Sequence, residues 1–367
     1  MTRLDQGILR PVAYPSMDGL RFYAALLVFM VHYIGSVRTS ILGMSPIDSV
    51  PPTFIEKSLT AMGDGHHGVD IFFILSGFLM GRHVFGRSEN FSYWRFIASR
   101  FKRIYPAFLV SYIAAVSLAF YFGMSWRPYD ALTGLVFLNA IPALGVIPYH
   151  YVSWSIGFEF FFYFVFPALL LGNNLIPAHV RVGAAFVACL LLTTTVPDFE
   201  WALRLTGLFA GLWLSFVPDT LFKSMNKSIP WYLWISPYVF YLLTRDTPPQ
   251  LWSFLLSLVS GACLLSVIVF GRNPLSRAAE TKIARFLGTI SYSFYLWHTL
   301  CLSVAFHIIM PRLGLNGGNH LSEALMLAAI AMSLSVFVSY ASYIATERFY
   351  FSKKHRVAGA STIIQSS

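Results

Sequence analysis

Long apolar runs separated by short polar stretches dominate the chain. A membrane-spanning helix needs about 20 mainly apolar residues, and ten runs approach that length: 20–36, 68–81, 104–122, 154–172, 182–197, 201–217, 229–244, 251–271, 286–310 and 322–346. An eleventh run, 131–147, is interrupted by Gly134, Pro142 and Gly145, so a span, a re-entrant hairpin and an interfacial helix are all open for it. The pattern predicts an all-α polytopic membrane protein with about ten transmembrane helices.

Composition supports this fold class. Of the 367 residues, 56% are hydrophobic and only 11% are charged, whereas a soluble domain carries about 25% charged residues. This excludes a disordered chain, collagen, a secreted disulfide scaffold and an ordinary cytosolic enzyme. We expect a lipid bilayer around the protein and no nucleic-acid partner. The three cysteines lie in apolar runs without CxxC spacing, which predicts neither a disulfide nor a metal site.

The basic residues predict an orientation. If 131–147 does not cross and the N-terminus is inside, 19 of the 26 Lys and Arg residues fall on the cytoplasmic side and 5 on the outer side. Cytoplasmic loops are enriched in Lys and Arg, so we expect ten spans with both termini cytoplasmic. The organisation predicted is one transmembrane domain over residues 1–350 and a short cytoplasmic tail over 351–367, without a cleavable signal peptide.

Ionisable groups inside the spans are the first candidates for function, because each costs about 2.5–3.5 kcal/mol or more in a membrane helix. Arg21 and His32 are 11 residues apart, which is about 20° past three full helical turns. They therefore share one face, about 16 Å apart along the axis, and Asp18 lies on the same side. This stripe predicts a general base, or a network that only positions helices.

Two carboxylates lie at a similar predicted depth to His32, in the outer half of the membrane. Glu159 lies among aromatic residues and Asp70 follows a pair of histidines. Together they can handle protons in catalysis, although an N-cap or a surface carboxylate explains Asp70 equally well. His298, with Tyr292 on the same run, is either functional or a satisfied structural histidine.

The polar stretch between the second and third spans carries six basic residues, Arg95, Arg100 and Arg103 among them. Membrane anchoring explains part of this density. Arg also binds phosphate through its planar fork. A phosphorylated cytosolic ligand and anionic lipid are the two interpretations.

Five pieces in order resemble the acyltransferase 3 family of integral-membrane O-acyltransferases. They are MDGLRFYAALLVFMVH (17–32), GVDIFFILSGFLM (68–80), RFKRIYP (100–106), SWSIGFEFFFYFVFP (153–167) and ISYSFYLWH (290–298). Each piece alone is weakly specific, but five in family order are strongly specific. The resemblance covers nearly the whole chain.

This resemblance implies transfer of an acyl group, usually acetyl from acetyl-CoA, to a hydroxyl of an envelope or secreted carbohydrate, such as O-antigen, exopolysaccharide or a lipid-linked sugar. It implies a multi-pass protein of the bacterial cytoplasmic membrane. The roles predicted are catalysis by His32, Glu159 and Asp70, binding of the acyl-CoA by Arg21, Arg95, Arg100 and Arg103, and binding of the acceptor by Trp154, Tyr292 and His298. The family's SGF turn falls on 76–78. No metal is expected.

Some members carry a C-terminal extracytoplasmic hydrolase-like domain, which we expect this chain to lack. It then acts alone, as a homodimer or with a separate extracytoplasmic transferase. Two other function classes stay open: a proton-coupled transporter or flippase of a lipid-linked glycan, and a sensor or assembly subunit. Missing repeat symmetry argues mildly against a transporter built from two halves.

Overall fold

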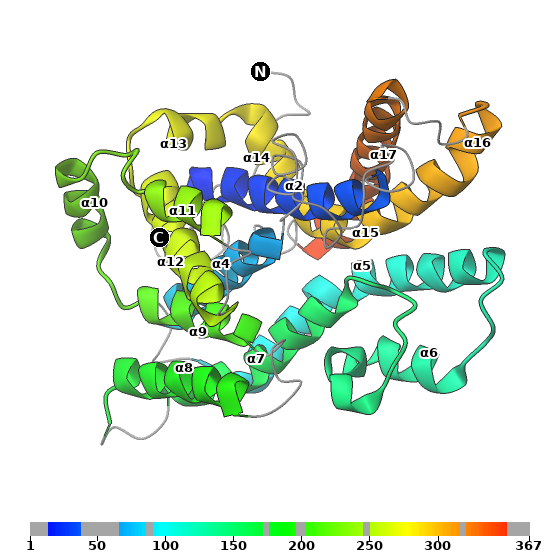
Figure 1. Ribbon diagram of the computed structural model, residues 1–367. Coiled ribbons are helices and arrows are strands. Elements are labelled where there is room, and N and C mark those ends of the chain that lie inside the picture. Colours follow the sequence, from blue (N-terminus) through cyan, green and yellow to red (C-terminus); the bar gives the residue numbers. More distant parts are fainter. Residues whose placement is uncertain are drawn as a thin grey trace, which may run out of the picture. The chain divides into compact units, whose positions relative to one another are not determined.

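A computed structural model describes residues 14–37, 66–85, 91–171, 176–195, 203–244, 250–315 and 321–350. Every regular element in those ranges is helical (Figure 1), which confirms the all-α class. The predicted tail over 351–367 lies outside the described residues. The chain divides into two compact units: the first comprises residues 1–91, 158–291 and 317–325, and the second comprises 92–157, 292–316 and 326–367.

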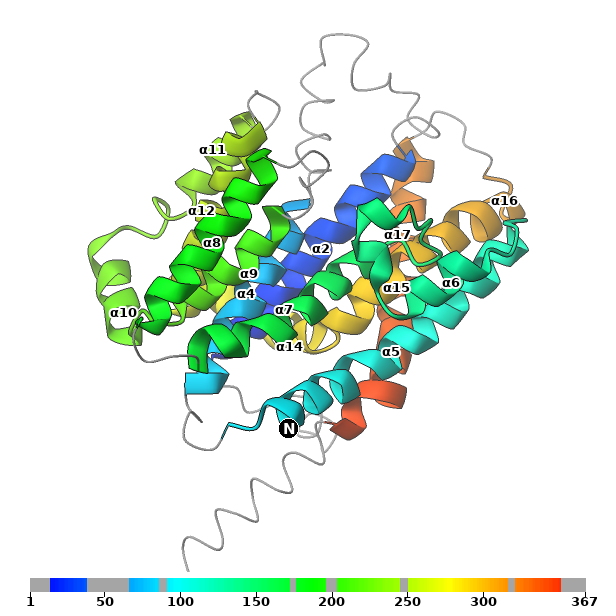
Figure 2. The same cartoon turned by 90° about the horizontal axis from the view of Figure 1, so that it is seen from below.

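The first unit is arranged around one central helix, α4 (His66–Phe85). It packs against α2 (Pro15–Val37), α9 (Leu203–Leu214) and α12 (Gln250–Val269), as both cartoon views show (Figures 1 and 2). Further helices pack on these four: α8 (Ala178–Thr195) on α9, α11 (Ser236–Thr244) on α12, and α13 (Pro274–Ala279) and α14 (Lys282–Thr289) on α2.

Glycines let α4 and α9 approach backbone to backbone. A Cβ built on Gly77 would lie 2.0 Å from the carbonyl oxygen of Leu208, and one on Gly211 would lie 2.0 Å from that of Ile74. Small residues at such crossings leave no side chain between the two helices, so that their backbones come into direct contact. Residues 76–78 are therefore not a turn, as the resemblance implied. They belong to the continuous helix α4, and Gly77 serves the crossing with α9.

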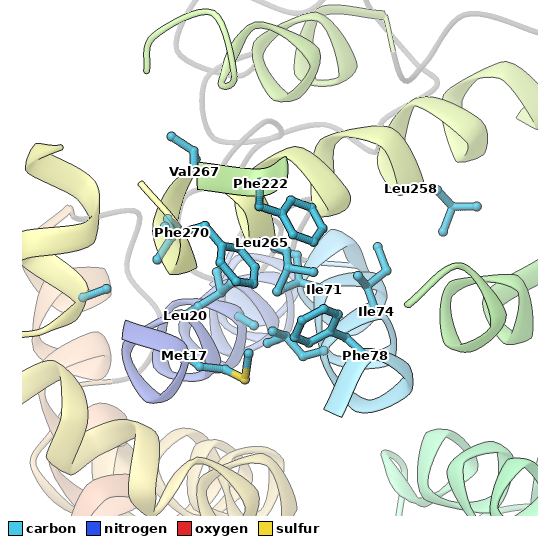
Figure 3. Close-up of a cluster of buried hydrophobic side chains, with 14 residues drawn as sticks. Met17, Leu20, Ile71, Ile74, Phe78, Phe222, Leu258, Leu265, Val267 and Phe270 are labelled. Atoms are coloured by element: carbon cyan, nitrogen blue, oxygen red, sulfur yellow. The ribbon is translucent and has the colours of Figure 1, made fainter. Parts of the chain in front are cut away.

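A buried hydrophobic cluster joins α2, α4 and α12 to the helix that follows α9 (Figure 3). Its aromatic members are Phe78, Phe222 on α10 (Asp219–Ser228) and Phe270, with ring centroids 4.5–6.4 Å apart. Beside them α9 and α10 meet at a bend of 97°. Arg82 holds this bend by donating to the carbonyl of Val217 (2.5 Å) and to Asp219 (2.9 Å).

The second unit contains α5 (Tyr93–Tyr121), α6 (Pro128–Leu135), the first residues of α7 (Ser153–Leu171), most of α15 (Ser291–Val304) and of α17 (Leu321–Ser342), and the π-helical turns η5 (Ala305–Ile309) and η6 (Tyr343–Glu347). The run 131–147 is not one helix. It comprises the end of α6 and two three-residue 3-10 turns, η2 (Leu138–Ala140) and η3 (Pro142–Leu144). This agrees with leaving it out of the predicted spans.

Six helices among the described residues are long and apolar enough to cross a membrane, or seven if the bent pair α9–α10 is one span. The protein is therefore a multi-pass membrane protein. Each of the ten predicted runs contains at least part of a helix, but the count of ten spans is not confirmed, because some of these helices fall below the length or hydropathy of a full span. Helices α9 and α11 have 12 and 9 residues, and α4 carries charged residues and histidines near both ends.

Candidate functional site

His32 lies on α2, whose unbroken helix places it on one face with Arg21, as the spacing predicted. Its Nδ1–H donates to the carbonyl of Val28 at 2.8 Å. In a neutral imidazole this leaves Nε2 as the unprotonated nitrogen, which is the atom a general base needs. Arg21 pairs with the buried Asp18 at 3.0 Å, one turn earlier on the same helix.

Glu159 on α7 lies in the first unit and is half-buried. The hydroxyls of Ser76 on α4 and Tyr163 on α7 both donate to its Oε1 through short hydrogen bonds. In the sequence, Tyr163 follows a row of phenylalanines, a pattern more typical of packing and lipid contact than of a polar role. The structure instead gives its hydroxyl a direct role in holding the carboxylate.

Asp70 is buried on α4 and binds two other helices. Arg204 on α9 reaches Oδ1 at 3.1 Å, and Ser257 on α12 donates to Oδ2 at 2.6 Å. Because the Ser257 hydroxyl is used as a donor there, it accepts from Nδ1–H of His67, also at 2.6 Å. The rings of Tyr238 and Tyr241 flank His67, with centroids 5.0 and 5.1 Å away. Both oxygens of Asp70 thus hold α4 to α9 and α12.

Three of the four residues predicted to bind the acyl donor, Arg95, Arg100 and Arg103, lie on α5 in the second unit, whereas Arg21 lies on α2 in the first. Arg95 is exposed and Arg103 half-buried, but Arg100 is only 4% exposed, with its guanidinium 5.0 Å above the ring of Phe96. Arg100 and Arg103 are three residues apart, so they lie on neighbouring turns of one face. The basic residues that orient a membrane protein lie in solvent at the cytoplasmic surface, whereas Arg100 is buried.

The residues predicted to bind the acceptor also belong to the second unit. Tyr292 donates its hydroxyl to the carbonyl of Ile104, which ties α15 to α5 (3.0 Å). His298 is fully buried and its Nδ1–H donates to the carbonyl of Tyr295 at 2.8 Å. Trp154 is half-buried at the start of α7. The hydrogen bond of Tyr292 therefore holds two helices together.

Sequence reasoning missed several members of these networks. Ser257 lies in an apolar run where serine is common, so it carries no signal. Arg204 stands out as a charged residue within an apolar run, but the sequence does not pair it with Asp70. His67 had a weak one, since it precedes Asp70 by three residues. Glu347, buried in η6 and accepting from Ser293 at 2.7 Å, was also missed. Among the described residues, no cluster of three or more His, Cys, Asp or Glu side chains could hold a metal.

Comparison with known proteins identifies relatives along most of the chain. The acyltransferase domain of the acyltransferase 3 family matches residues 14–344. Acyltransferase MdmB of Streptomyces mycarofaciens is 24% identical over 89% of this chain and 89% of its own length. Exopolysaccharide production protein ExoZ of Rhizobium meliloti is 26% identical over 77% of this chain and 90% of its own.

A third relative, the peptidoglycan O-acetyltransferase OatA of Listeria monocytogenes, is 24% identical over 77% of this chain but 48% of its own length. No solved structure matches the chain. The family match covers far more than half of the sequence and includes all five motifs quoted above. The chain therefore belongs to the acyltransferase 3 family.

Proposed function

We propose that this protein transfers an acyl group, acetyl in the simplest case, from acyl-CoA to a hydroxyl of a cell-envelope or secreted carbohydrate. The observation that carries the proposal is His32, whose Nδ1–H is fixed on the Val28 carbonyl in a chain of an acyltransferase family. Relatives named for exopolysaccharide production and peptidoglycan O-acetylation support a carbohydrate acceptor. The positive-inside pattern supports the bacterial cytoplasmic membrane as the location.

In the proposed reaction, Nε2 of His32 takes the proton of the acceptor hydroxyl as its oxygen attacks the thioester carbonyl. The carbon–sulfur bond breaks, and the imidazolium returns the proton to the leaving thiolate. The products are the ester and free CoA. Transient acylation of His32 itself is the alternative route. Arg21 lies on the same face of α2 as His32, and its ion pair with Asp18 holds its side chain in place.

The other predicted residues divide between binding and positioning. Arg100 and Arg103, with Arg95, would bind the phosphates of CoA, for which the planar guanidinium is suited. Glu159, held by Ser76 and Tyr163, would stabilise positive charge on the imidazole during turnover. Asp70 is better described as a positioning residue, since both of its oxygens hold neighbouring helices.

The test uses the full chain in lipid nanodiscs with radiolabelled acetyl-CoA and envelope glycans from the source cells. Wild type should transfer label to glycan, and His32→Ala should lose at least about 100-fold in rate with unchanged expression. His179→Ala, on the exposed face of α8, is the matched control and should keep full activity. Full activity in His32→Ala would contradict the mechanism. Glycan movement in liposomes without acyl turnover would instead favour the transporter.

A further inference from the structure

His150 is a buried histidine that the proposed mechanism does not use. It lies in the second unit, between the broken segment 131–147 and α7, and is 1% exposed. Neither ring nitrogen makes a hydrogen bond of ordinary geometry to any described residue, and the same holds for Oδ1 of the half-buried Asn139. A buried polar group without a partner costs about 1–3 kcal/mol, so such groups in a native protein require an explanation.

One hydroxyl connects these two residues. The Oγ of Ser153, at the start of α7, donates to the carbonyl of His150 at 2.7 Å and accepts from Nδ2 of Asn139 at 2.8 Å. The amide of Asn139 is therefore oriented by its nitrogen, while its oxygen has no partner. The ring of His150 is fixed by an edge-on contact with Phe108, with centroids 6.0 Å apart. Both side chains are thus held in place, while Oδ1 of Asn139 and both ring nitrogens of His150 make no hydrogen bond of ordinary geometry.

The protonation state of His150 indicates what these atoms can bind. Burial lowers the pKa of His150 to about 4, and nearby carbonyls of Leu296 and of His150 itself oppose this shift only in part. At neutral pH the ring therefore offers one N–H donor and one acceptor, and Asn139 adds a second acceptor. A hydroxyl both donates and accepts, so neighbouring hydroxyls of a sugar match this set. An anion does not, because neither residue carries a cation.

The surroundings fit an acceptor site. Leu296 belongs to α15, where it lies four residues after Tyr292 and two residues before His298. Tyr292 and His298 are two of the residues predicted to bind the acceptor. Ser155 on α7 and Tyr295 on α15 share a hydrogen bond of 2.7 Å. We propose that His150 and Asn139 form a hydroxyl-binding subsite for the carbohydrate acceptor, an inference that rests on the proposed acyl transfer.

The segment that precedes this subsite contains a strained residue. Phe137 packs on Phe108 with ring centroids 4.4 Å apart and has a left-handed backbone, with φ of 63°. A bulky residue in this conformation is strained by about 1–3 kcal/mol. Gly145, with φ of 60°, allows a second sharp change of direction at no such cost. The segment before His150 is therefore strained at Phe137, whose ring packs on the same Phe108 ring as that of His150.

Two variants test the subsite in the nanodisc assay. His150→Phe keeps the ring shape and removes both nitrogens, and His150→Gln keeps a donor and an acceptor. We expect His150→Phe to raise the apparent KM for the glycan fraction at least about 10-fold, with acetyl-CoA binding unchanged, and His150→Gln to recover part of the loss. His307→Phe, exposed on η5, is the matched control and should behave as wild type.

Stability separates a binding residue from a structural one. Because the nitrogens of His150 make no hydrogen bond of ordinary geometry to a described residue, His150→Phe should leave the apparent Tm unchanged or raise it by about 2 °C. A lower Tm, a normal glycan KM or a loss of acetyl-CoA binding in this variant would each overturn the subsite. If wild type transfers no label, the proposed function fails instead. The Tm comparison still shows whether His150 has a structural partner.

Discussion

Arg204 lies 3.1 Å from the carboxylate of Asp70 and joins α9 to α4 across 134 residues of chain. The Asp70 side chain is 5% exposed and that of Arg204 24%, so the pair is largely withdrawn from solvent. Removing one partner of such a pair leaves a poorly compensated charge, which costs more than the pair itself contributes.

The Asp70–Arg204 pair predicts a strong coupling between two substitutions. Asp70→Asn should destabilise the protein by about 2 kcal/mol, below the range for fully buried pairs because Arg204 retains some solvent. Adding Arg204→Gln should recover part of that loss. The apparent Tm of the two single variants and the double variant completes the cycle. Additive losses would show that the two residues act independently.

The close approach of α4 and α9 at their glycines predicts that a larger residue there lowers the stability of the protein, whereas the same substitution at an open glycine does not. Gly77→Ala would place a methyl group 2.0 Å from the Leu208 carbonyl, so the helices must separate and the apparent Tm should fall by several degrees. Gly35→Ala on α2 meets nothing within 4 Å and should gain about 0.5–1 kcal/mol of helix stability. Equal effects of the two substitutions would contradict the close crossing.

The two hydroxyl donors on Glu159 predict graded losses of activity. Tyr163→Phe and Ser76→Ala each remove one hydrogen bond to Oε1, worth about 1 kcal/mol or somewhat more to a charged acceptor. Each should lower the transfer rate about 5- to 10-fold, and the double variant should lose more than either. Tyr232→Phe, on an exposed ring, serves as control. Unchanged rates would remove Glu159 from the mechanism.

The basic pair on α5 predicts a donor-specific defect. Arg100→Lys keeps the charge but loses the fork that binds phosphate with two parallel hydrogen bonds. It should raise the KM for acetyl-CoA about 10-fold and leave the glycan KM unchanged, and Arg103→Ala should act in the same direction. Lys102→Ala lies between them, on an exposed position, and should have little effect. A raised glycan KM alone would place the pair in acceptor binding.

The lowered pKa of His150 predicts a stability loss in acid. The ordinary histidine pKa is about 6.5, and the folded value is about 4 because the ring is buried. The unfolded chain therefore binds more protons between these values, so stability falls as the pH drops through that window, by up to about 3 kcal/mol. His150→Phe should fall less steeply between pH 7 and 4.5, as read from apparent Tm. Parallel curves would contradict the assignment.

Much of the architecture follows from the sequence. The length of the apolar runs predicts the helices, and the 11-residue spacing of Arg21 and His32 predicts their shared face, because a helix has a fixed period. The interruption of 131–147 by proline and glycines also agrees with its short turns. These features are local, so one sequence suffices to read them.

The partners of the buried groups could not be read in this way. Asp70 finds Arg204 and Ser257 on helices distant in sequence, and a serine in an apolar run does not differ in pattern from one that only packs. The turn expected at 76–78 came from the family resemblance, and these residues instead lie within α4. Whether a glycine bends the chain or admits a neighbouring backbone depends on tertiary contacts that no local pattern encodes.

The close crossing of α4 and α9 also limits how the protein can move during a reaction cycle. Each helix has a notch at a glycine that receives the other's peptide group, so sliding by one residue would bring a side chain against a carbonyl. The two helices must therefore travel as one rigid body. Ser76, Asp70 and Arg204 keep their spacing throughout, and substrate entry requires hinges elsewhere in the chain.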